Sequence, residues 1–250
     1  RFANMLAICL EKVGLQLIIH LTSDELSKEK LALLKLKEIQ ARSVVLVPTT
    51  GTGNLDENYF QGLQVIQLIR RANICAPFRT VLVNDRQAIV DAVTHLANQN
   101  HQRIAYIGGN TELSSGADRL SAFKEGLKAA GPNLLTDWIV TGEPSFDMGF
   151  RAAQSLVEQR GATAIVCGGI ELSNGALNGC LEKGVLIPHE IDFVGYGDPS
   201  YYQWIGGGLS TIRLPVDCLA EHVSDIIYRN TTVEEYNQHH GIFKAELIVR

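Results

Sequence analysis

Residues 103–123, RIAYIGGNTELSSGADRLSAF, constrain the fold more than any other part of the sequence. The stretch begins with a short apolar run of the kind that a parallel sheet buries on both faces, and Gly108 and Gly109 then let the backbone turn tightly. A polar loop follows, after which apolar residues recur at helical spacing, with Ser114 or Ser115 as the expected cap. The stretch therefore predicts a strand that leads directly into a helix, and ligands of open α/β sheets bind at such strand ends.

The rest of the chain repeats this alternation of strands and helices. The patterns predict strands at residues 15–20, 43–47, 65–69, 81–84, 138–140, 163–167, 191–196 and 244–249. They predict helices at residues 2–13, 24–41, 85–100, 147–160, 172–184 and 215–228. Gly161 and Gly184 are expected just past helix C-termini. Such an alternation predicts an α/β fold, in which parallel sheets are wound with helices on both faces.

Length and charge limit the possible functions. The chain has 250 residues, of which 46% are hydrophobic, enough for one large or two small domains with real cores. Its net charge is −5 and its pI is near 5.8, and no basic run is present, so this polypeptide alone is not expected to grip nucleic acid. No signal peptide and no run of 18 apolar residues occurs, so no membrane partner is expected.

Motifs for catalysis or metal binding are absent from the sequence. The five cysteines are odd in number, widely scattered and never in a C-x-x-C pair, which favours reduced thiols in a cytoplasmic protein. There is no nucleophile elbow, P-loop, H-E-x-x-H motif or clustered metal spacing, and the seven histidines are spread along the chain. We therefore expect no enzyme, no catalytic residue, no metal and no cofactor.

The central stretch resembles the effector-binding core of the lactose-repressor-like transcription regulators. The residues that carry the resemblance are two glycines at a strand end and a Gly-x-x-Arg-Leu-x-x-Phe pattern: Gly108, Gly109, Gly116, Arg119, Leu120 and Phe123. Further blocks similar to the family follow in the family's order at residues 81–85, 163–169, 184–198 and 209–215. The resemblance covers nearly the whole chain.

This resemblance implies an architecture like that of periplasmic binding proteins. It implies two doubly wound parallel-sheet lobes that are joined by three crossings, with a ligand crevice between them. The N-terminal lobe is expected to comprise residues 1–100 and 213–231, and the C-terminal lobe residues 101–212 and 242–250. The first strand of the N-terminal lobe and the DNA-binding headpiece of the family are not in this sequence.

The resemblance also implies a function. The chain would be the effector-sensing core of a bacterial repressor, a homodimer that contacts operator DNA only through an N-terminal helix-turn-helix. The alternative is a periplasmic solute-binding protein of a sugar transporter, which has the same two-lobed architecture. The segment encoded upstream discriminates between them, because a regulator has a helix-turn-helix there and a transport component has a signal sequence.

The candidate ligand-binding residues follow from the family pattern. Arg119 matches an arginine that binds the effector's polar groups in relatives, although its spacing alone also fits a solvated surface charge. Phe2 matches an aromatic residue at the floor of the pocket, or is an ordinary core phenylalanine. The remaining candidates occupy positions where sugar-binding relatives place acceptors or an aromatic wall: Arg70, Phe146, Gly169 and Asp198.

The departures from the pattern bear on the charge of the effector. Gly197, Gly169 and Ile170 stand where sugar-binding relatives have carboxylates or amides, and Arg70 adds a cation. A sugar-like effector that is phosphorylated or acidic is therefore expected, since arginines bind such anions in bidentate fashion. In the opposing interpretation Asp198 pairs with Arg119, and the site accepts a neutral ligand.

Overall fold

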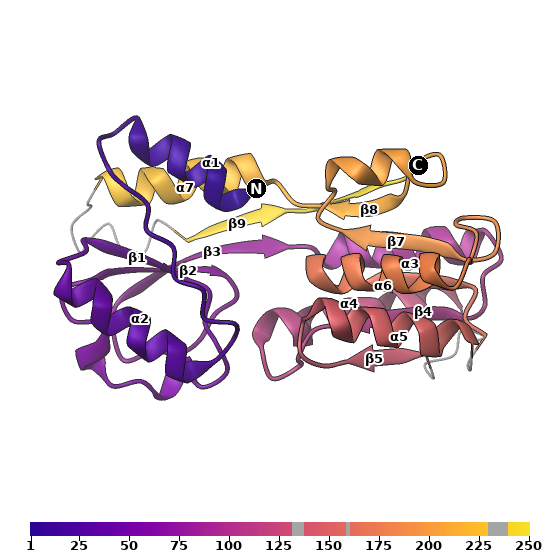
Figure 1. Ribbon diagram of the computed structural model, residues 1–250, viewed down its shortest axis with the longest axis horizontal. Helices are drawn as coiled ribbons and strands as arrows, with labels where there is room; N and C mark the ends of the chain where they lie inside the picture. Colours follow the sequence, from indigo (N-terminus) through magenta and orange to yellow (C-terminus); the bar gives the residue numbers. More distant parts are fainter. Residues whose placement is uncertain (132–137, 159–160, 230–239) are drawn as a thin grey trace. The chain divides into compact units, whose positions relative to one another are not determined.

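The chain folds into two compact units. The computed structural model describes residues 1–131, 138–158, 161–229 and 240–250. One unit, called unit 1, contains Arg1–Val83 and Pro215–Phe243, and the other, unit 2, contains Asn84–Leu214 and Lys244–Arg250. The chain crosses from one unit to the other three times, so the predicted class of two α/β lobes with three crossings is confirmed (Figure 1).

Unit 2 is built on a parallel sheet with one antiparallel edge. In its described residues the strand order is β10-β8-β7-β6-β4-β5, and only β10 runs antiparallel to its neighbour. The strands are β4 (Ile104–Gly108), β5 (Ile139–Thr141), β6 (Ala164–Cys167), β7 (Asp192–Tyr196), β8 (Ser210–Arg213) and β10 (Glu246–Ile248). Every residue of β4 and β6 is buried, which explains why both read as continuous apolar runs.

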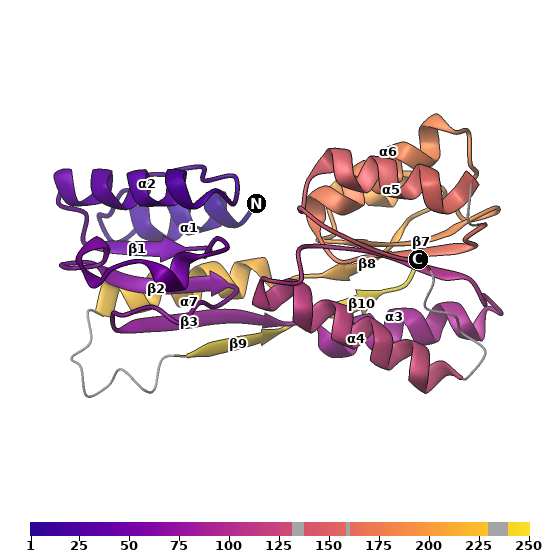
Figure 2. The same cartoon turned by 90° about the horizontal axis from the view of Figure 1, so that it is seen from below.

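Helices cover both faces of this sheet (Figure 2). One face packs against α3 (Arg86–Asn98) and α4 (Ser114–Ala130), where the ring of Tyr106 stacks on Phe123 at 4.7 Å between centroids. The other face packs against α5 (Phe146–Glu158) and α6 (Ile170–Glu182), and the short η3 (Ser200–Trp204) follows β7. The strand and helix predicted from the central stretch are thus β4 and α4.

Helices α5 and α6 approach so closely that only glycine fits at their contact. A Cβ at Gly175 would lie 1.9 Å from the carbonyl oxygen of Phe146, and one at Gly149 would lie 2.3 Å from that of Leu172. The backbones of the two helices are therefore in direct contact. Gly184, which follows α6 in the left-handed conformation with φ +70°, ends that helix as predicted.

Unit 1 contains a smaller sheet with the order β1-β2-β3-β9 in the described residues. Its strands are β1 (Ser43–Leu46), β2 (Gln64–Ile69), β3 (Phe78–Asn84) and β9 (Gly241–Lys244), and the first three are parallel. One face packs against α1 (Phe2–Glu11) and α7 (Val216–Arg229), and the other against α2 (Leu26–Glu38). Two short turns, η1 (Thr52–Asn54) and η2 (Glu57–Tyr59), connect β1 to β2.

Residues 15–20 do not form the strand that was predicted for them. They have no strand pairing, and they line a cavity of about 470 Å³ in unit 1 together with residues of α1, α2 and β1. Their apolar side chains made the segment resemble a buried strand. A strand requires a hydrogen-bonded neighbour, however, and this segment belongs to neither of the two sheets in the described residues.

One unit boundary and one helix cap differ from the prediction. The first crossing lies between Val83 and Asn84, before α3, whereas residues 1–100 were assigned to the first lobe. Helix α3 belongs to unit 2 because it packs on α4, where a Cβ at Gly126 would lie 2.8 Å from the Cβ of Val93. The cap also differs, since α4 begins after Leu113 without a side-chain cap from either serine.

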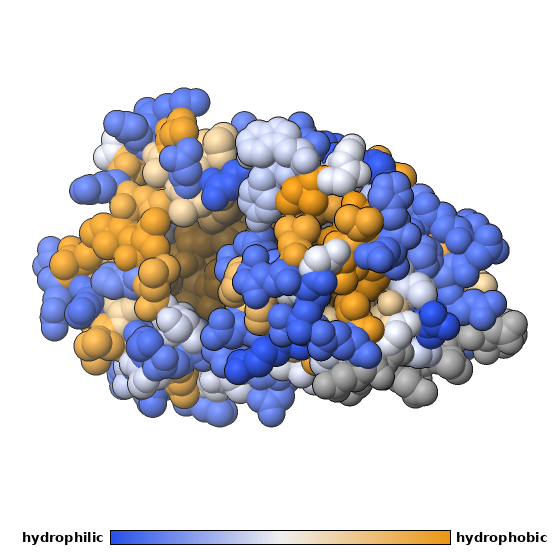
Figure 3. Space-filling model, turned by 45° about the vertical axis from the view of Figure 1, so that its right-hand side comes forward, coloured by the Kyte–Doolittle hydropathy of each residue, from blue (hydrophilic) through white to orange (hydrophobic). Residues whose placement is uncertain are grey.

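Apolar side chains are also exposed. Figure 3 shows apolar patches among hydrophilic residues on one face of the molecule. The exposed residues of unit 1 include Ile18 and Ile19, at 52% and 59%, and Leu31 and Leu34 on α2, at 54% and 46%. No helix in the described ranges is both long and apolar enough to span a bilayer.

Candidate functional site

Arg119 lies near the start of α4 and is held on three sides. Its Nε donates to Asp85 Oδ2 at 2.6 Å, and its Nη1 donates to the carbonyl oxygen of Gly168 at 3.0 Å. The guanidinium carbon lies 4.5 Å from the centroid of the Tyr196 ring, within the range of a cation–π contact. The side chain is only 12% exposed, so Arg119 is not the solvated surface charge that its spacing also allowed.

Asp85 and Tyr196 complete this arrangement, which we call the Arg119 cluster. Tyr196 Oη donates to Asp85 Oδ2 at 2.5 Å, so this one carboxylate oxygen accepts from both the phenol and the guanidinium. The aspartate directly precedes α3, the arginine belongs to α4, and the tyrosine ends β7. The cluster thus joins three elements of unit 2 at the carboxyl ends of its strands, where ligands of open α/β sheets bind.

The charges in the cluster compensate each other. Burial disfavours the charged guanidinium, but its interactions with Tyr196 and Asp85 outweigh burial and hold the pKa of Arg119 above its ordinary value. Burial raises the pKa of Tyr196 well above 10.0, so this phenol stays neutral and donates a hydrogen bond to Asp85. A cation and an anion remain, and their charges cancel.

A further polar atom lies at the same strand ends. Tyr106 Oη is buried and has no hydrogen-bond partner among the described residues. A Cβ at Gly168 would lie 2.3 Å from this oxygen, and one at Gly108 would lie 2.9 Å from it. The two glycines therefore make room for the tyrosine.

The loops that follow β6 and β7 also depend on glycine. Gly169 precedes α6, and its carbonyl oxygen accepts from Ser173 N at 2.9 Å and from Ser173 Oγ at 2.8 Å. Gly197 has a φ of +104°, and a Cβ there would lie 2.8 Å from Cγ1 of Ile170. A carboxylate side chain at position 197 would be strained in this backbone, so this chain requires glycine there.

Asp198 pairs with Arg250 and not with Arg119. Arg250 Nη2 donates to Asp198 Oδ1 at 2.7 Å, and the two side chains are 18% and 9% exposed. The interpretation in which Asp198 neutralises Arg119 is therefore wrong. Arg119 is neutralised nevertheless, because Asp85 takes that role.

Arg70 and Phe2 belong to unit 1. Arg70 forms an ion pair with Asp24, at 2.9 Å between Nη2 and Oδ1, and its side chain is 12% exposed. Phe2 begins α1, is half-buried, and lines the cavity of unit 1. Since both Arg70 and Arg119 have a carboxylate partner, the expectation that they form an uncompensated pair of cations is not met.

Phe146 lies in unit 2 at the start of α5. It is 40% exposed and stacks on Phe150 with 6.4 Å between the ring centroids. Of the predicted residues, Gly169 lies next to the Arg119 cluster, because the carbonyl oxygen of the preceding residue, Gly168, accepts from Arg119. Asp198 follows Tyr196 of the cluster by two residues.

Sequence reasoning missed Asp85 and Tyr196 as site residues. Both lay inside blocks that resemble the family, VLVND and VGYGD, and both follow or end a predicted strand. Polar residues at the carboxyl ends of parallel strands were the available signal. Their partnership could not be found from spacing, because 111 positions separate them.

A second polar group lies at the amino ends of the strands in unit 2. His101 Nε2 lies 2.6 Å from Asp192 Oδ2, and His101 Nδ1 lies 3.0 Å from Thr163 Oγ1. These residues precede or begin β4, β6 and β7, so the group ties three strand starts together. In the part of the chain that the structure describes, no three histidine, cysteine or acidic residues are grouped to hold a metal ion.

The sequence and the fold define the class of protein to which this chain belongs. The chain belongs to the periplasmic binding protein-like domain family, whose model matches residues 93–250. Its sequence is 32% identical to the HTH-type transcriptional repressor PurR of Klebsiella pneumoniae over 142 residues. That match covers 56% of this chain and 42% of the repressor, so less than half of the relative is represented.

Solved structures share the fold over the whole chain. One is described as a probable LacI family transcriptional regulator from Corynebacterium glutamicum, with a TM-score of 0.86 at 21% identity, covering 100% of this chain and 91% of that one. Another is the transcription regulator CcpA of Lactococcus lactis, with a TM-score of 0.79 at 20% identity, covering 100% and 92%. The predicted resemblance to lactose-repressor-like regulators is confirmed, and these relatives are regulators rather than enzymes.

Proposed function

We propose that this chain is the effector-sensing core of a bacterial transcription regulator and binds a small molecule at the Arg119 cluster. The observation that carries the proposal is the match to an HTH-type repressor, in a chain whose whole length has the fold of LacI family regulators. A transport component is not favoured, because the matched relatives are regulators. The activity belongs to the cytoplasm, where the operator is.

The effector that we propose is sugar-like. The sequence predicts a phosphorylated or acidic ligand because Gly197, Gly169 and Ile170 replace the acceptors of sugar-binding relatives, so that a neutral sugar would leave the charge of Arg119 unpaired. Asp85 supplies the partner, so a neutral polar ligand leaves no buried charge uncompensated. Because the Arg119–Asp85 pair carries no net charge, the cluster supports an uncharged sugar as the ligand. The phosphorylated and acidic forms of the same sugar are the ligands to compare with it.

Calorimetric titration tests this proposal. Neutral pentoses and hexoses, their phosphates and their acid derivatives are titrated into the protein, and the best binder is repeated with Arg119→Ala and Asp85→Asn. Loss of a hydrogen bond to a charged group should weaken binding by about 1.5–3 kcal/mol. Arg213→Ala removes an exposed ion pair, 46% exposed at the arginine, and serves as the control. If both variants bind the ligand as tightly as the wild type, the ligand does not bind at the Arg119 cluster.

We propose that operator DNA is contacted by a helix-turn-helix segment N-terminal to this core. The core carries a net charge of −5, and helix-turn-helix dimers read two half-sites one helical turn apart. Mobility-shift assays should show operator binding for a chain that includes such a segment and none for the core. DNA binding by the core alone would contradict the proposal.

We further propose that the core forms a two-fold homodimer. Exposed apolar residues support this, among them Ile8 on α1 at 43% and Leu181 on α6 at 46%. A symmetric dimer matches the symmetry of a palindromic operator. Sedimentation velocity at micromolar concentration measures it, and Ile8→Asp should shift the protein towards monomer. A protein that sediments as a monomer at all concentrations would rule out the dimer.

A further inference from the structure

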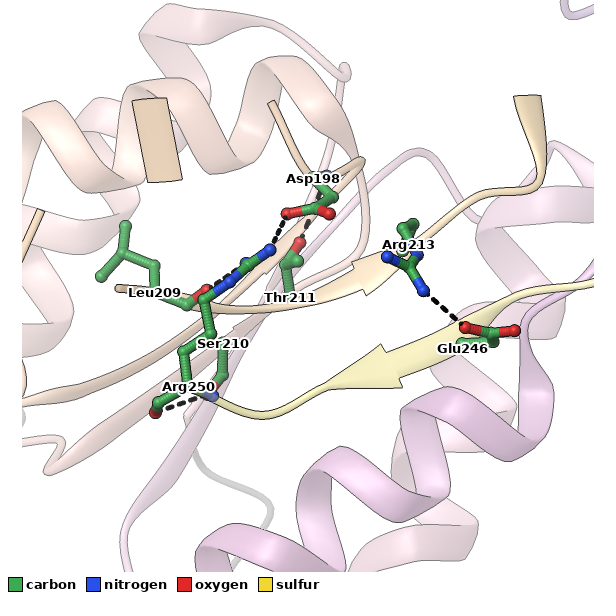
Figure 4. A network of polar contacts seen from close by, with 7 residues as sticks. All are labelled: Asp198, Leu209, Ser210, Thr211, Arg213, Glu246 and Arg250. Atoms are coloured by element: carbon green, nitrogen blue, oxygen red, sulfur yellow. Dashed lines mark hydrogen bonds and ion pairs between the residues drawn. The ribbon is translucent and has the colours of Figure 1, made fainter. Parts of the chain in front are cut away.

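Arg250 holds the turn that follows β7, through several contacts (Figure 4). Its Nη2 donates to Asp198 Oδ1 at 2.7 Å, and its Nη1 donates to the carbonyl oxygen of Leu209 at 2.8 Å. Its backbone N–H donates to Ser210 Oγ at 3.1 Å. The guanidinium is therefore fixed between the turn and the strand β8, and it forms an ion pair with the Asp198 carboxylate.

The turn has a left-handed backbone. Gly197 and Asp198 have φ values of +104° and +49°, which glycine adopts without strain and which aspartate adopts more readily than most residues with a side chain. Gly197 N donates to Ile212 O at 2.8 Å, and Asp198 N donates to Thr211 Oγ1 at 3.4 Å. Together with the ion pair to Arg250, these bonds keep the turn in place.

The turn is directly connected to the Arg119 cluster. It begins at the residue after Tyr196, whose hydroxyl donates to Asp85 and whose ring covers the guanidinium of Arg119. Both the turn and the cluster are also tied to segments where the chain crosses between units. Asp85 follows Asn84, whose carbonyl accepts from Ala245 N at 3.0 Å, and Ala245 directly precedes β10.

We propose that Arg250 is a positioning residue of the effector site. It fixes the Gly197–Asp198 turn and thereby the orientation of Tyr196 against Asp85 and Arg119. The same side chain attaches the turn to β10, so a ligand that moves the turn also moves the strand that follows the last crossing. The inference rests on the proposed effector site at the Arg119 cluster.

The chain provides a matched control for this role. Arg213 and Glu246 form a second ion pair between β8 and β10, at 2.9 Å, as Figure 4 shows. Its side chains are 46% and 66% exposed, whereas those of Arg250 and Asp198 are 18% and 9% exposed. Arg250→Gln and Arg213→Gln therefore each remove one arginine charge from an ion pair at this edge of the sheet, and only the first removes a contact to the turn.

Hydrogen exchange measured by mass spectrometry tests the positioning without any ligand. In Arg250→Gln, peptides that contain Tyr196, Gly197 and the Asp85 segment should exchange faster, by about tenfold on the scale of an allosteric coupling. Peptides from α5 should be unchanged. Arg213→Gln should leave all of them unchanged. Equal exchange in both variants, or faster exchange throughout unit 2, would overturn the proposal.

Ligand affinity distinguishes a positioning role of Arg250 from a purely structural one, because a loss of stability alone would not change the affinity of the folded protein. With the best-binding sugar of the titration panel, measured well below the unfolding temperature, Arg250→Gln should weaken binding about tenfold. Arg250→Lys, which keeps a cation for Asp198, should recover part of this loss. In the double variant with Arg119→Ala, the second substitution should add little, because both act on one cluster. Additive losses would overturn the proposal.

Two outcomes separate this inference from the proposed function. If no sugar, sugar phosphate or sugar acid binds the wild-type protein, the proposed effector class fails, and the exchange measurement alone decides the role of Arg250. If a sugar binds and depends on Arg119 but not on Arg250, the effector site stands and the positioning role fails. Should Arg250→Gln not fold, Asp198→Asn removes the same ion pair while keeping the side-chain volume, and its exchange pattern decides.

Discussion

Arg119 and Asp85 show how strongly one buried ion pair can constrain a site. Their side chains are 12% and 8% exposed, so removing one partner leaves the other charge in a poorly solvated place. We predict that Arg119→Met and Asp85→Ala each lower the free energy of unfolding by about 3–5 kcal/mol. The double variant should lose less than the sum, because no lone charge remains. Urea unfolding followed by circular dichroism measures this, and additive losses would contradict it.

A second single residue, Cys180, is expected to make the free energy of unfolding depend on pH. Burial raises the pKa of its thiol from 9.0 to about 11, so the folded state binds this proton more tightly than the unfolded state. Its contribution to stability is complete below pH 9 and is lost as the pH rises to about 11. A shift of two pKa units corresponds to roughly 3 kcal/mol.

Cys180→Ala tests this prediction. The wild-type protein should lose more free energy of unfolding between pH 8.5 and pH 11 than the variant does, by roughly 2 kcal/mol. Cys218→Ala, at an exposed position on α7, is the control and should behave like the wild type. If the Cys180 variant loses as much stability as the wild type over this interval, the burial of this thiol does not control the pH dependence.

The sequence locates candidate site residues more readily than their partners. Arg119 is a candidate because a Gly-x-x-Arg-Leu-x-x-Phe pattern lies on a strand-to-helix junction, and that junction has a local signature. Asp85, its partner, lies 34 positions away on another element, and no local pattern records such a pairing. The same holds for Asp198, whose partner Arg250 is 52 positions away. Charges can be located from the sequence, but their neutralisation depends on tertiary structure.

At the scale of elements, the predictions succeeded where a terminating residue was present. The end of α6 was predicted from Gly184, and its start and those of its neighbours lie close to their predicted positions. The segment 15–20 failed because its apolar residues say nothing about whether a neighbouring strand exists. The cap of α4 failed because Ser114 and Ser115 are already inside the helix.

The contact between α5 and α6 makes a prediction in which two effects oppose each other. Gly175→Ala should favour the helix by up to about 1 kcal/mol through propensity alone. The new Cβ would lie 1.9 Å from the carbonyl oxygen of Phe146, however, and the two helices would have to move apart. Because overpacking costs about 1–3 kcal/mol and here strikes backbone, we predict net destabilisation of unit 2.

Thermal and urea unfolding of Gly175→Ala measure the sign of this effect. Glu182→Ala, at an exposed position on the same helix, is the control and should be neutral or slightly stabilising. A Gly175→Ala protein as stable as the wild type would mean that the helices separate at no cost.

At the scale of the whole molecule, the two units differ in how well they are packed. Unit 2 covers both faces of its sheet with helices in close contact, whereas unit 1 contains a cavity of about 470 Å³ beside β1. Missing contacts around a cavity lower stability. We predict that amides of β1 exchange before those of the buried strand β6, and that unit 1 unfolds at a lower urea concentration.

A cavity-filling variant tests the cause. Ala32 on α2 lines the cavity, and Ala32→Leu should raise the stability of unit 1 by about 0.5–2 kcal/mol without affecting unit 2. Leu31→Ala, at an exposed position on the same helix, is the control and should have little effect. Simultaneous unfolding of both units, unaffected by Ala32→Leu, would contradict a separate weakness of unit 1.

The three crossings also determine when each unit can fold during translation. Unit 1 requires α7 and β9, which come after nearly all of unit 2, and unit 2 requires β10 and Arg250, which come after α7. Neither sheet is complete until the ribosome has made almost every residue described here. Chaperones that bind nascent chains would therefore meet two unfinished sheets with open edges until β9 and β10, which are only a few residues apart, have both been made.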